Sequence, residues 1–325
     1  MDPYDALNFI LNPDGSITRL DSSVPTTPPT GYDYNDSSVA SIDVPLNTTT
    51  NTWIRIFHPL NLPSDTKLPI IVYFHGGGFL LFSAASLTLH DFCVHLAGET
   101  PALVLSVDYR LAPENRLPAA YEDAVDAVLW LKQQALHGEH KFTTFVDFTQ
   151  CFIMGSSSGG NIAYHAGLRA LNLNISPVEI RGLILNIPFF GGVERTESEL
   201  KCVDDPILPL PVADLMWELA LPVGTDRDHE YSNPMVEGSN QKDIQRLPTC
   251  YVNGYEMDPL VDREKQLVEK LKGHGVCVVE HFFDDADAYH AVEFFDPDKG
   301  RALVMDLKDF IYSPVTAASV DKPIE

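Results

Sequence analysis

The sequence predicts an α/β fold, with a mostly parallel central sheet, helices on both faces and a cap over one edge of the sheet. Strand-like and helix-like segments alternate between residues 70 and 187 and again between residues 249 and 311. This alternation favours parallel strands joined by right-handed crossovers. A stretch rich in Pro, Asp and Glu interrupts the alternation from Pro188 to about Leu247, which indicates an insertion.

Size and composition are compatible with one large domain. The chain has 325 residues, of which 45% are hydrophobic, so it can bury a substantial core. We therefore expect a single domain over residues 1–325, with cap elements at approximately 1–37 and 190–247. The net charge of −24 argues against binding to nucleic acid or anionic membranes, because both attract clustered Lys and Arg.

The sequence predicts a cytoplasmic protein that is not secreted, with a nuclear location also open. Residues 1–5 are acidic and lack the basic and apolar regions of a secretory signal. The most apolar stretch, residues 68–82, is broken by His75 and three glycines, so we expect no membrane span. The five cysteines are odd in number and lack C-x-x-C spacing, which indicates reduced thiols and no metal site.

The first sixty residues predict an arm followed by a hairpin. Residues 1–37 are rich in Asp, Pro, Ser and Thr, so we expect an irregular arm whose apolar patch, residues 6–11, docks elsewhere. Two β-rich runs, residues 40–44 and 53–57, flank a polar turn and predict a β-hairpin.

The central elements then follow in order. Residues 70–74 form a continuous apolar run, as expected of a strand buried on both faces of a parallel sheet. Strands are also predicted at 102–107, before Ser157, and at 180–187, with helices at 86–98, at 118–134 and from Ser157 to about 171. Within the insertion, only residues 212–221 have a clear amphipathic pattern. Beyond it we expect strands at 249–254 and 276–283, helices at 261–273 and 297–311, and a frayed end over the last dozen residues.

The turn between the strand before Ser157 and the helix after it carries the first candidate catalytic residue. Gly155-x-Ser157-x-Gly159 matches the nucleophile elbow, in which a sharp turn holds a serine hydroxyl above the sheet. Glycines relieve the crowding that such a turn creates. A serine nucleophile also needs a base, a group that orients the base, and donors for the oxyanion.

The oxyanion donors are predicted where the strand at 70–74 ends. Without Cβ atoms, the glycines after His75 let backbone N–H groups approach an anion. Gly77 and Gly78, together with the N–H of Ser158, are the expected oxyanion hole.

The acid and the base are predicted in the loops after the last two strands. Asp258 follows the strand at 249–254, and Glu256 and Asp262 are alternatives close by. His290 lies between the last strand and the last helix. The chain order Ser157, Asp258, His290, each after a separate strand, is the order expected of an α/β-hydrolase.

These motifs together resemble the plant carboxylesterases of the hormone-sensitive-lipase group. The resemblance covers nearly the whole chain and also includes residues 106–114, 116–121, 159–163 and 258–262. It implies that Asp258, and not Asp262, is the triad acid, that the glycines after His75 form the oxyanion hole, and that the arm joins the insertion in a cap over the pocket. It also implies that residues 108–120 tie loops together beneath the site.

Three residues depart from the group's usual pattern. Ser156 replaces an acidic residue before the nucleophile, and Ser158 replaces an alanine after it. Only the backbone N–H of Ser158 is needed, so we expect the chemistry to survive with a more polar pocket floor. Ala288 stands where glycine is usual, which leaves the placement of His290 to be tested.

The predicted protein is a serine carboxylesterase that hydrolyses an ester of a small, largely apolar plant metabolite, without cofactor or metal. We expect an apolar pocket built from Phe79, Phe189, Phe190 and Trp217, and a monomer or weak homodimer. One alternative is a plant alkaloid enzyme in which the same triad couples ester cleavage to decarboxylation or elimination, or transfers an acyl group. Another is a hormone-binding protein similar to gibberellin receptors, where the catalytic histidine is replaced. The presence of His290 argues against it.

Overall fold

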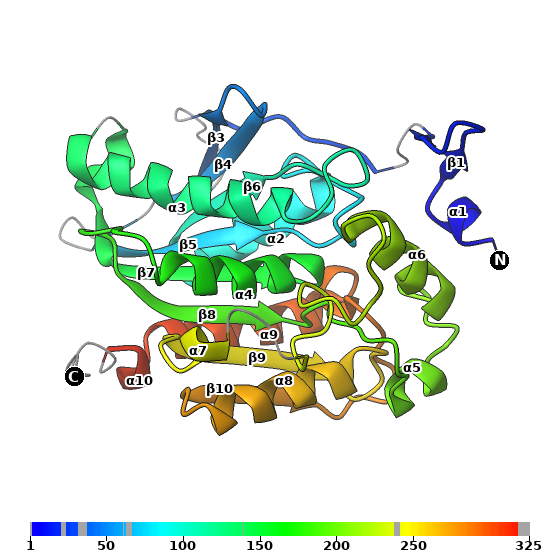
Figure 1. The fold of residues 1–325 in the computed structure, drawn as a ribbon. Coiled ribbons are helices and arrows are strands. Elements are labelled where there is room, and N and C mark those ends of the chain that lie inside the picture. Colours follow the sequence, from blue (N-terminus) through cyan, green and yellow to red (C-terminus); the bar gives the residue numbers. More distant parts are fainter. Residues whose placement is uncertain are drawn as a thin grey trace.

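An eight-stranded sheet organises the structure, which is a computed structural model (Figure 1). It describes residues 2–20, 24–31, 38–60, 62, 67–138, 140–236 and 241–317. The strand order is β10-β9-β8-β7-β5-β6-β4-β3. The strands are β3 (Val39–Asn47), β4 (Thr52–Pro59), β5 (Leu68–Phe74), β6 (Leu103–Asp108), β7 (Val146–Ser156), β8 (Ile180–Asn186), β9 (Thr249–Tyr255) and β10 (Val278–Phe283).

The sheet is parallel except at one edge. β3 and β4 form the predicted antiparallel hairpin, and β4 also runs antiparallel to β6. The remaining neighbours, from β6 to β10, pair in parallel. Their carboxyl ends therefore lie at one edge, where open α/β sheets place their sites.

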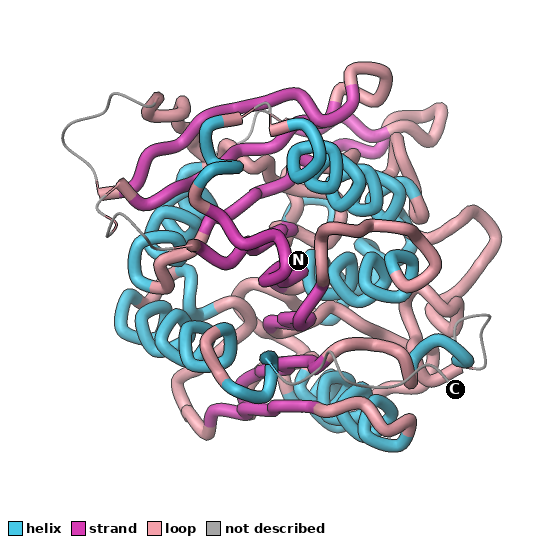
Figure 2. Tube along the Cα trace, turned by 90° about the vertical axis from the view of Figure 1, so that its left-hand side faces the viewer, coloured by secondary structure: helices cyan, strands magenta, loops and turns pink. Residues whose placement is uncertain are grey.

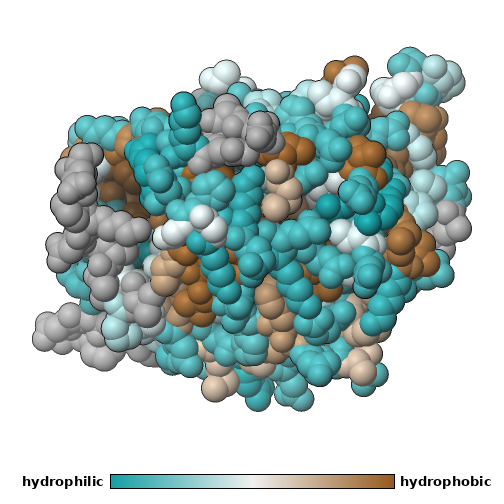
Figure 3. Space-filling model, turned by 60° about the horizontal axis from the view of Figure 1, so that its bottom comes forward, coloured by the Kyte–Doolittle hydropathy of each residue, from teal (hydrophilic) through white to brown (hydrophobic). Residues whose placement is uncertain are grey.

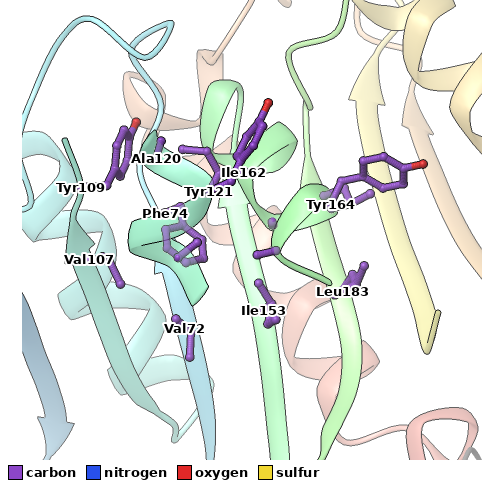
Figure 4. Close-up of a cluster of buried hydrophobic side chains, with 14 of the residues drawn as sticks. Val72, Phe74, Val107, Tyr109, Ala120, Tyr121, Ile153, Ile162, Tyr164 and Leu183 are labelled. Carbon is purple, nitrogen blue, oxygen red and sulfur yellow. The ribbon is translucent and has the colours of Figure 1, made fainter. Parts of the chain in front are cut away.

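Helices cover both faces of the sheet (Figure 2). Helices α3 (Ala119–His137), α4 (Ser158–Ala170) and α8 (Val261–Gly273) pack on one face, and α2 (Leu87–Glu99) and α9 (Pro297–Ile311) pack on the other. Successive side chains of a strand point to opposite faces, so Val72 and Phe74 join the first core and Ile71 and Tyr73 the second. Figure 4 shows Val72, Phe74 and Ile153 of the sheet packed against Ile162 of α4.

The amino-terminal arm is more regular than the sequence predicts. It contains α1 (Pro3–Ala6) and a small antiparallel pair, β1 (Phe9–Leu11) and β2 (Ile17–Arg19). These strands have three residues each, too few for a periodic pattern to reveal. Leu7 and Phe9 are buried in the same core as the insertion, so the apolar patch does dock. Residues 1, 21–23 and 32–37 of the predicted arm lie outside the described residues.

In the residues that the structure describes, the insertion contains the short helices α5 (Glu197–Lys201), α6 (Leu210–Ala220) and α7 (Gln241–Ile244). Helix α6 corresponds to the predicted amphipathic patch, and α1 contacts it. In Figure 1, α5, α6 and the arm gather at the right, beyond the end of the sheet where β9 terminates. At the carboxyl end, α10 (Pro314–Ala317) replaces part of the predicted frayed tail, and residues 318–325 lie outside the described residues.

The exterior is mainly polar on the face drawn in Figure 3, where hydrophobic residues are scattered among hydrophilic ones. Two short 3₁₀ helices, η1 (Lys141–Thr144) and η2 (Val292–Phe294), complete the elements of the described chain. Across those residues, no helix combines the length and apolar character required to cross a membrane.

Candidate active site

Ser157 stands on the sharp turn between β7 and α4. Its φ of 54° and ψ of −119° lie outside the regions that residues with side chains usually occupy. Two glycines make the turn possible: a Cβ on Gly155 would lie 1.9 Å from the carbonyl oxygen of Gly159, and one on Gly159 would lie 1.9 Å from that of Phe74. The close backbone approach explains why the sequence places glycines on both sides of Ser157.

The imidazole of His290 lies against this serine. The distance from His290 Nε2 to Ser157 Oγ is 2.9 Å, and from His290 Nδ1 to Asp258 Oδ2 it is 2.8 Å. All three side chains are buried, since Ser157 is 8%, His290 3% and Asp258 0% exposed. The structure thus brings together the three residues predicted from strand ends, and Ala288 does not displace His290.

The two alternative acids face other partners. Glu256 pairs with Lys265, with both Oε–Nζ distances at 2.7 Å. Asp262 Oδ2 accepts the backbone N–H of Ser198 at 2.8 Å and so holds α5. Asp258 in turn is held by the N–H of Leu260, which donates to Oδ1 at 2.8 Å.

Acidic side chains surround His290 and control its protonation. Burial by itself disfavours the charged imidazole, but Asp258, Asp205 and Glu293 outweigh it and raise the pKa of His290 above its usual value. Burial also raises the pKa of the Glu293 carboxyl to about 7. Because Asp258 accepts from His290 Nδ1, the neutral ring carries its proton there and leaves Nε2 free to accept one.

The predicted oxyanion donors lie beside the serine. Gly77 and Gly78 have φ values of 108° and 60°, which favour glycine. Within the described residues, no acceptor takes the backbone N–H of Gly77, Gly78 or Ser158. Gly78 also lies under the insertion, because a Cβ there would be 2.2 Å from Met216 Sδ of α6.

Gly77, Gly78, Ser157 and His290 line a cavity of about 520 Å³. Its walls come from the loop after β5, the start of α2, the insertion, the His290 loop and the arm, through Ala6 and Leu7. Among the lining residues that the structure describes, only His290 carries an ionisable side chain. The cavity therefore suits an uncharged, largely apolar molecule.

The predicted pocket residues lie apart from this cavity, and Phe189, Phe190 and Trp217 line a separate, smaller one with Leu208 and Leu260. Phe79, Phe189, Phe190 and Trp217 are each 1% exposed and do not line the cavity with Ser157. Phe189 stacks on Trp217 with ring centroids 4.5 Å apart, and Phe79 lies 5.4 Å from the same indole. These rings pack behind the cavity and support α6, because large flat side chains fill the space between the insertion and the sheet.

The lining of the cavity with Ser157 comes instead from other apolar residues, both aliphatic and aromatic, that were not predicted as pocket residues. They include Leu7, Leu81, Ile207, Val212, Met216 and Phe294. Their segments have no shared pattern in the sequence, so only their convergence in space identifies them.

The departure at Ser156 is accommodated by a buried polar network. Asn186 Nδ2 donates to Ser156 Oγ at 2.9 Å and to Glu293 Oε1 at 2.7 Å. Asn253 Nδ2 donates to Asn186 Oδ1 at 2.8 Å. The acid behind the nucleophile is thus supplied by Glu293, three residues after His290, which the sequence analysis did not single out.

Comparison with known proteins gives a consistent picture. A family model described as an alpha/beta hydrolase fold matches residues 71–292. The chain is 51% identical to "Probable carboxylesterase 8" of Arabidopsis thaliana, over 96% of this chain and 94% of that protein. It is 48% identical to "3-O-acetylpapaveroxine carboxylesterase CXE2" of Papaver somniferum, over 95% and 99%. The solved structure of a hyperthermophilic esterase from the archaeon Pyrobaculum calidifontis superposes with a TM-score of 0.71 and 28% identity, covering 86% of both chains.

Proposed function

The chain belongs to the plant carboxylesterases of the alpha/beta hydrolase fold and is a carboxylic ester hydrolase, and on this premise we propose that Ser157, His290 and Asp258 carry out the reaction. The observation that supports this assignment most directly is the continuous hydrogen-bonded line from Ser157 Oγ through His290 to Asp258, which begins in the cavity.

In the acylation half of the reaction, the serine is the nucleophile and the histidine acts first as a base and then as an acid. Ser157 Oγ attacks the ester carbonyl carbon while its proton passes to His290 Nε2. The carbonyl oxygen becomes an oxyanion, which the N–H groups of Gly77, Gly78 and Ser158 stabilise. When the tetrahedral intermediate collapses, the C–O bond to the alcohol breaks and His290 returns its proton to the leaving alcohol.

Water completes the reaction by the same route. His290 Nε2 removes a proton from water as the water oxygen attacks the acyl-Ser157 carbonyl. Collapse of the second intermediate releases the acid and restores the Ser157 hydroxyl. Asp258 orients the ring and stabilises its charged form in both halves.

The substrate is a neutral ester of a small, largely apolar metabolite. An ionised group would lose its hydration in a cavity whose described lining has no ionisable side chain other than His290. The described parts of the arm and of the insertion act as a cap, since Leu7, Ile207 and Met216 supply walls that keep water out.

A second candidate is ester cleavage in plant alkaloid metabolism, including cleavage coupled to decarboxylation or elimination, or acyl transfer. It is favoured by the 48% identity to a protein named for 3-O-acetylpapaveroxine. The described lining offers no carboxylate to pair with an ammonium group, so the simple hydrolysis of a neutral ester remains the first candidate. Mass spectrometry of the products from an O-acetyl alkaloid would separate these reactions from simple hydrolysis.

The test of the triad is covalent labelling. A reactive organophosphate should add one phosphoryl group to Ser157, and Ser157→Ala should remain unlabelled. Ser156→Ala is the matched control and should still be labelled. His290→Ala should lose turnover of a simple acyl ester by roughly 10³-fold or more while still binding it. Labelling at another serine, or more than about a tenth of normal turnover in His290→Ala, would contradict the assignment of the triad.

A further inference from the structure

One carboxylate of the insertion joins the cap to the candidate base. We propose that Asp205 is a positioning residue for the reaction: it holds the backbone of His290 and the cavity wall at residues 206–209 as one unit. The inference rests on the proposed function of His290 and names a group that the triad does not include.

The contacts of Asp205 use both carboxylate oxygens. Oδ2 accepts the backbone N–H of His290 at 3.0 Å. Oδ1 accepts the N–H groups of Ile207 at 2.9 Å and Leu208 at 2.7 Å. A single side chain therefore satisfies three backbone donors from segments 85 residues apart in the sequence.

The surroundings make this contact stronger than a surface pairing. Asp205 is 5% exposed, so water competes little for its oxygens. Pro206, Ile207, Leu208 and Pro209 all line the cavity. Any movement of this wall is thus transmitted to the loop that carries His290.

The same segment also touches the loop of the triad acid. The backbone N–H of Asp205 donates to Cys202 O at 3.1 Å, and Cys202 Sγ donates to the carbonyl oxygen of Met257 at 3.3 Å. Met257 immediately precedes Asp258. The insertion therefore contacts both loops on which the orientation of the imidazole depends.

Asp205 also has an electrostatic effect on the base. The acidic groups that face His290 are Asp258 from the loop after β9, Asp205 from the insertion and Glu293 from η2. His290 becomes positively charged in the transition state, so the negative charge of Asp205 favours that state. Removing the charge should lower the pKa of His290.

Three variants separate these effects. Asp205→Asn keeps the shape of the side chain but removes its charge. The NH2 group of the asparagine must face a backbone N–H group that the carboxylate accepts in the wild type, so that hydrogen bond is lost. Asp205→Ser keeps a hydroxyl that can accept within the turn 205–208 but is too short to reach the N–H of His290. Asp228→Asn is the control, because Asp228 also accepts backbone and side-chain donors within the insertion, from Val193 and Asn233, but does not contact the His290 loop.

The measurement is the pH dependence of kcat/KM for a neutral acyl ester, with kcat and KM resolved. Activity should rise with pH as His290 loses its proton. Asp205→Asn should shift the midpoint to lower pH by roughly half a unit and lower kcat about tenfold. Asp205→Ser should also lower kcat, and amide hydrogen exchange in the peptide containing His290 should accelerate. Asp228→Asn should match the wild type in all three readouts.

The result that would overturn the proposal is a normal midpoint and kcat in Asp205→Asn. Normal exchange at His290 in Asp205→Ser would equally exclude the link, and this readout needs no catalysis. Failure of the triad is recognised separately, because His290→Ala would then retain turnover in a protein whose Asp205 is intact.

Discussion

Asp258, which we propose as the acid that orients His290, is one of several carboxylates within a short stretch of chain. Asp258 is fully buried and contacts the ring, whereas Asp262, four residues later, holds the first turn of α5. Both accept one backbone N–H at 2.8 Å, from Leu260 and Ser198 respectively, so they are a matched pair for substitution.

Asp258→Asn should lower kcat by roughly 10⁴-fold, because an amide can stabilise the wrong imidazole tautomer. Asp262→Asn should leave kcat near normal and lower the free energy of unfolding by about 1 kcal/mol through a weakened hydrogen bond. Steady-state kinetics and urea denaturation measure the two effects. Comparable losses of kcat in both variants would contradict the assignment of Asp258.

The candidate site lies in turns between strands and helices. Two glycines in the neighbouring helices, one in α4 and one in α2, differ sharply in how closely other atoms pack around them. Gly159 opens α4 directly beneath Phe74, and its missing Cβ leaves room for backbone atoms that cannot move aside. Gly98, near the end of α2, has only Val39 Cγ2 in reach, and a Cβ on this glycine would lie 3.4 Å from that atom.

The same substitution should therefore have opposite effects in these two helices. Gly98→Ala should raise the free energy of unfolding by up to about 1 kcal/mol, because alanine has a higher helix propensity than glycine. Gly159→Ala should lower it by more than about 2 kcal/mol, because the new methyl group would overlap Phe74 O. Thermal and urea denaturation provide the comparison, and a stable, fully active Gly159→Ala would contradict the tight elbow.

At the scale of the whole molecule, the loop at residues 108–120 connects the arm and the insertion to the sheet. Glu114 Oε2 accepts from Arg19 of the arm at 2.8 Å. Arg116 donates to the carbonyl oxygens of Glu218 and Leu221 at 2.7 Å each, and so holds the end of α6. The expected structural role of this loop thus includes attachment of both segments that we propose as the cap.

Docking of the arm should affect substrate binding more than the stability of the sheet. Phe9 is 3% exposed, whereas Leu11, in the same strand, is 51% exposed. Phe9→Ser should release the arm, remove Leu7 from the cavity wall and raise KM for an apolar ester severalfold, because apolar contact area is lost. Leu11→Ser is the control and should leave KM unchanged. Equal KM values in the two variants would argue against the arm as part of the cap.

Much of the fold and the triad could be predicted because the signals are local. Buried parallel strands are continuous apolar runs, as at residues 70–74, and polar residues after such runs must meet at one edge of the sheet. The boundaries of the main helices and strands accordingly agree to within about three residues, and His290 lies within hydrogen-bonding reach of both Ser157 and Asp258.

The remaining features depend on contacts between distant segments, which no local pattern records. An aromatic side chain is equally apolar in a core and in a pocket, so the sequence could not tell the two positions apart. In the structure, Phe189 and Trp217 are buried and stack on each other. Asp205 is one of 46 acidic residues in the sequence, and its importance follows from the folding of residue 205 against residue 290. Local periodicity thus specifies which elements form and which loops meet, while long-range packing specifies which side chains in those loops touch.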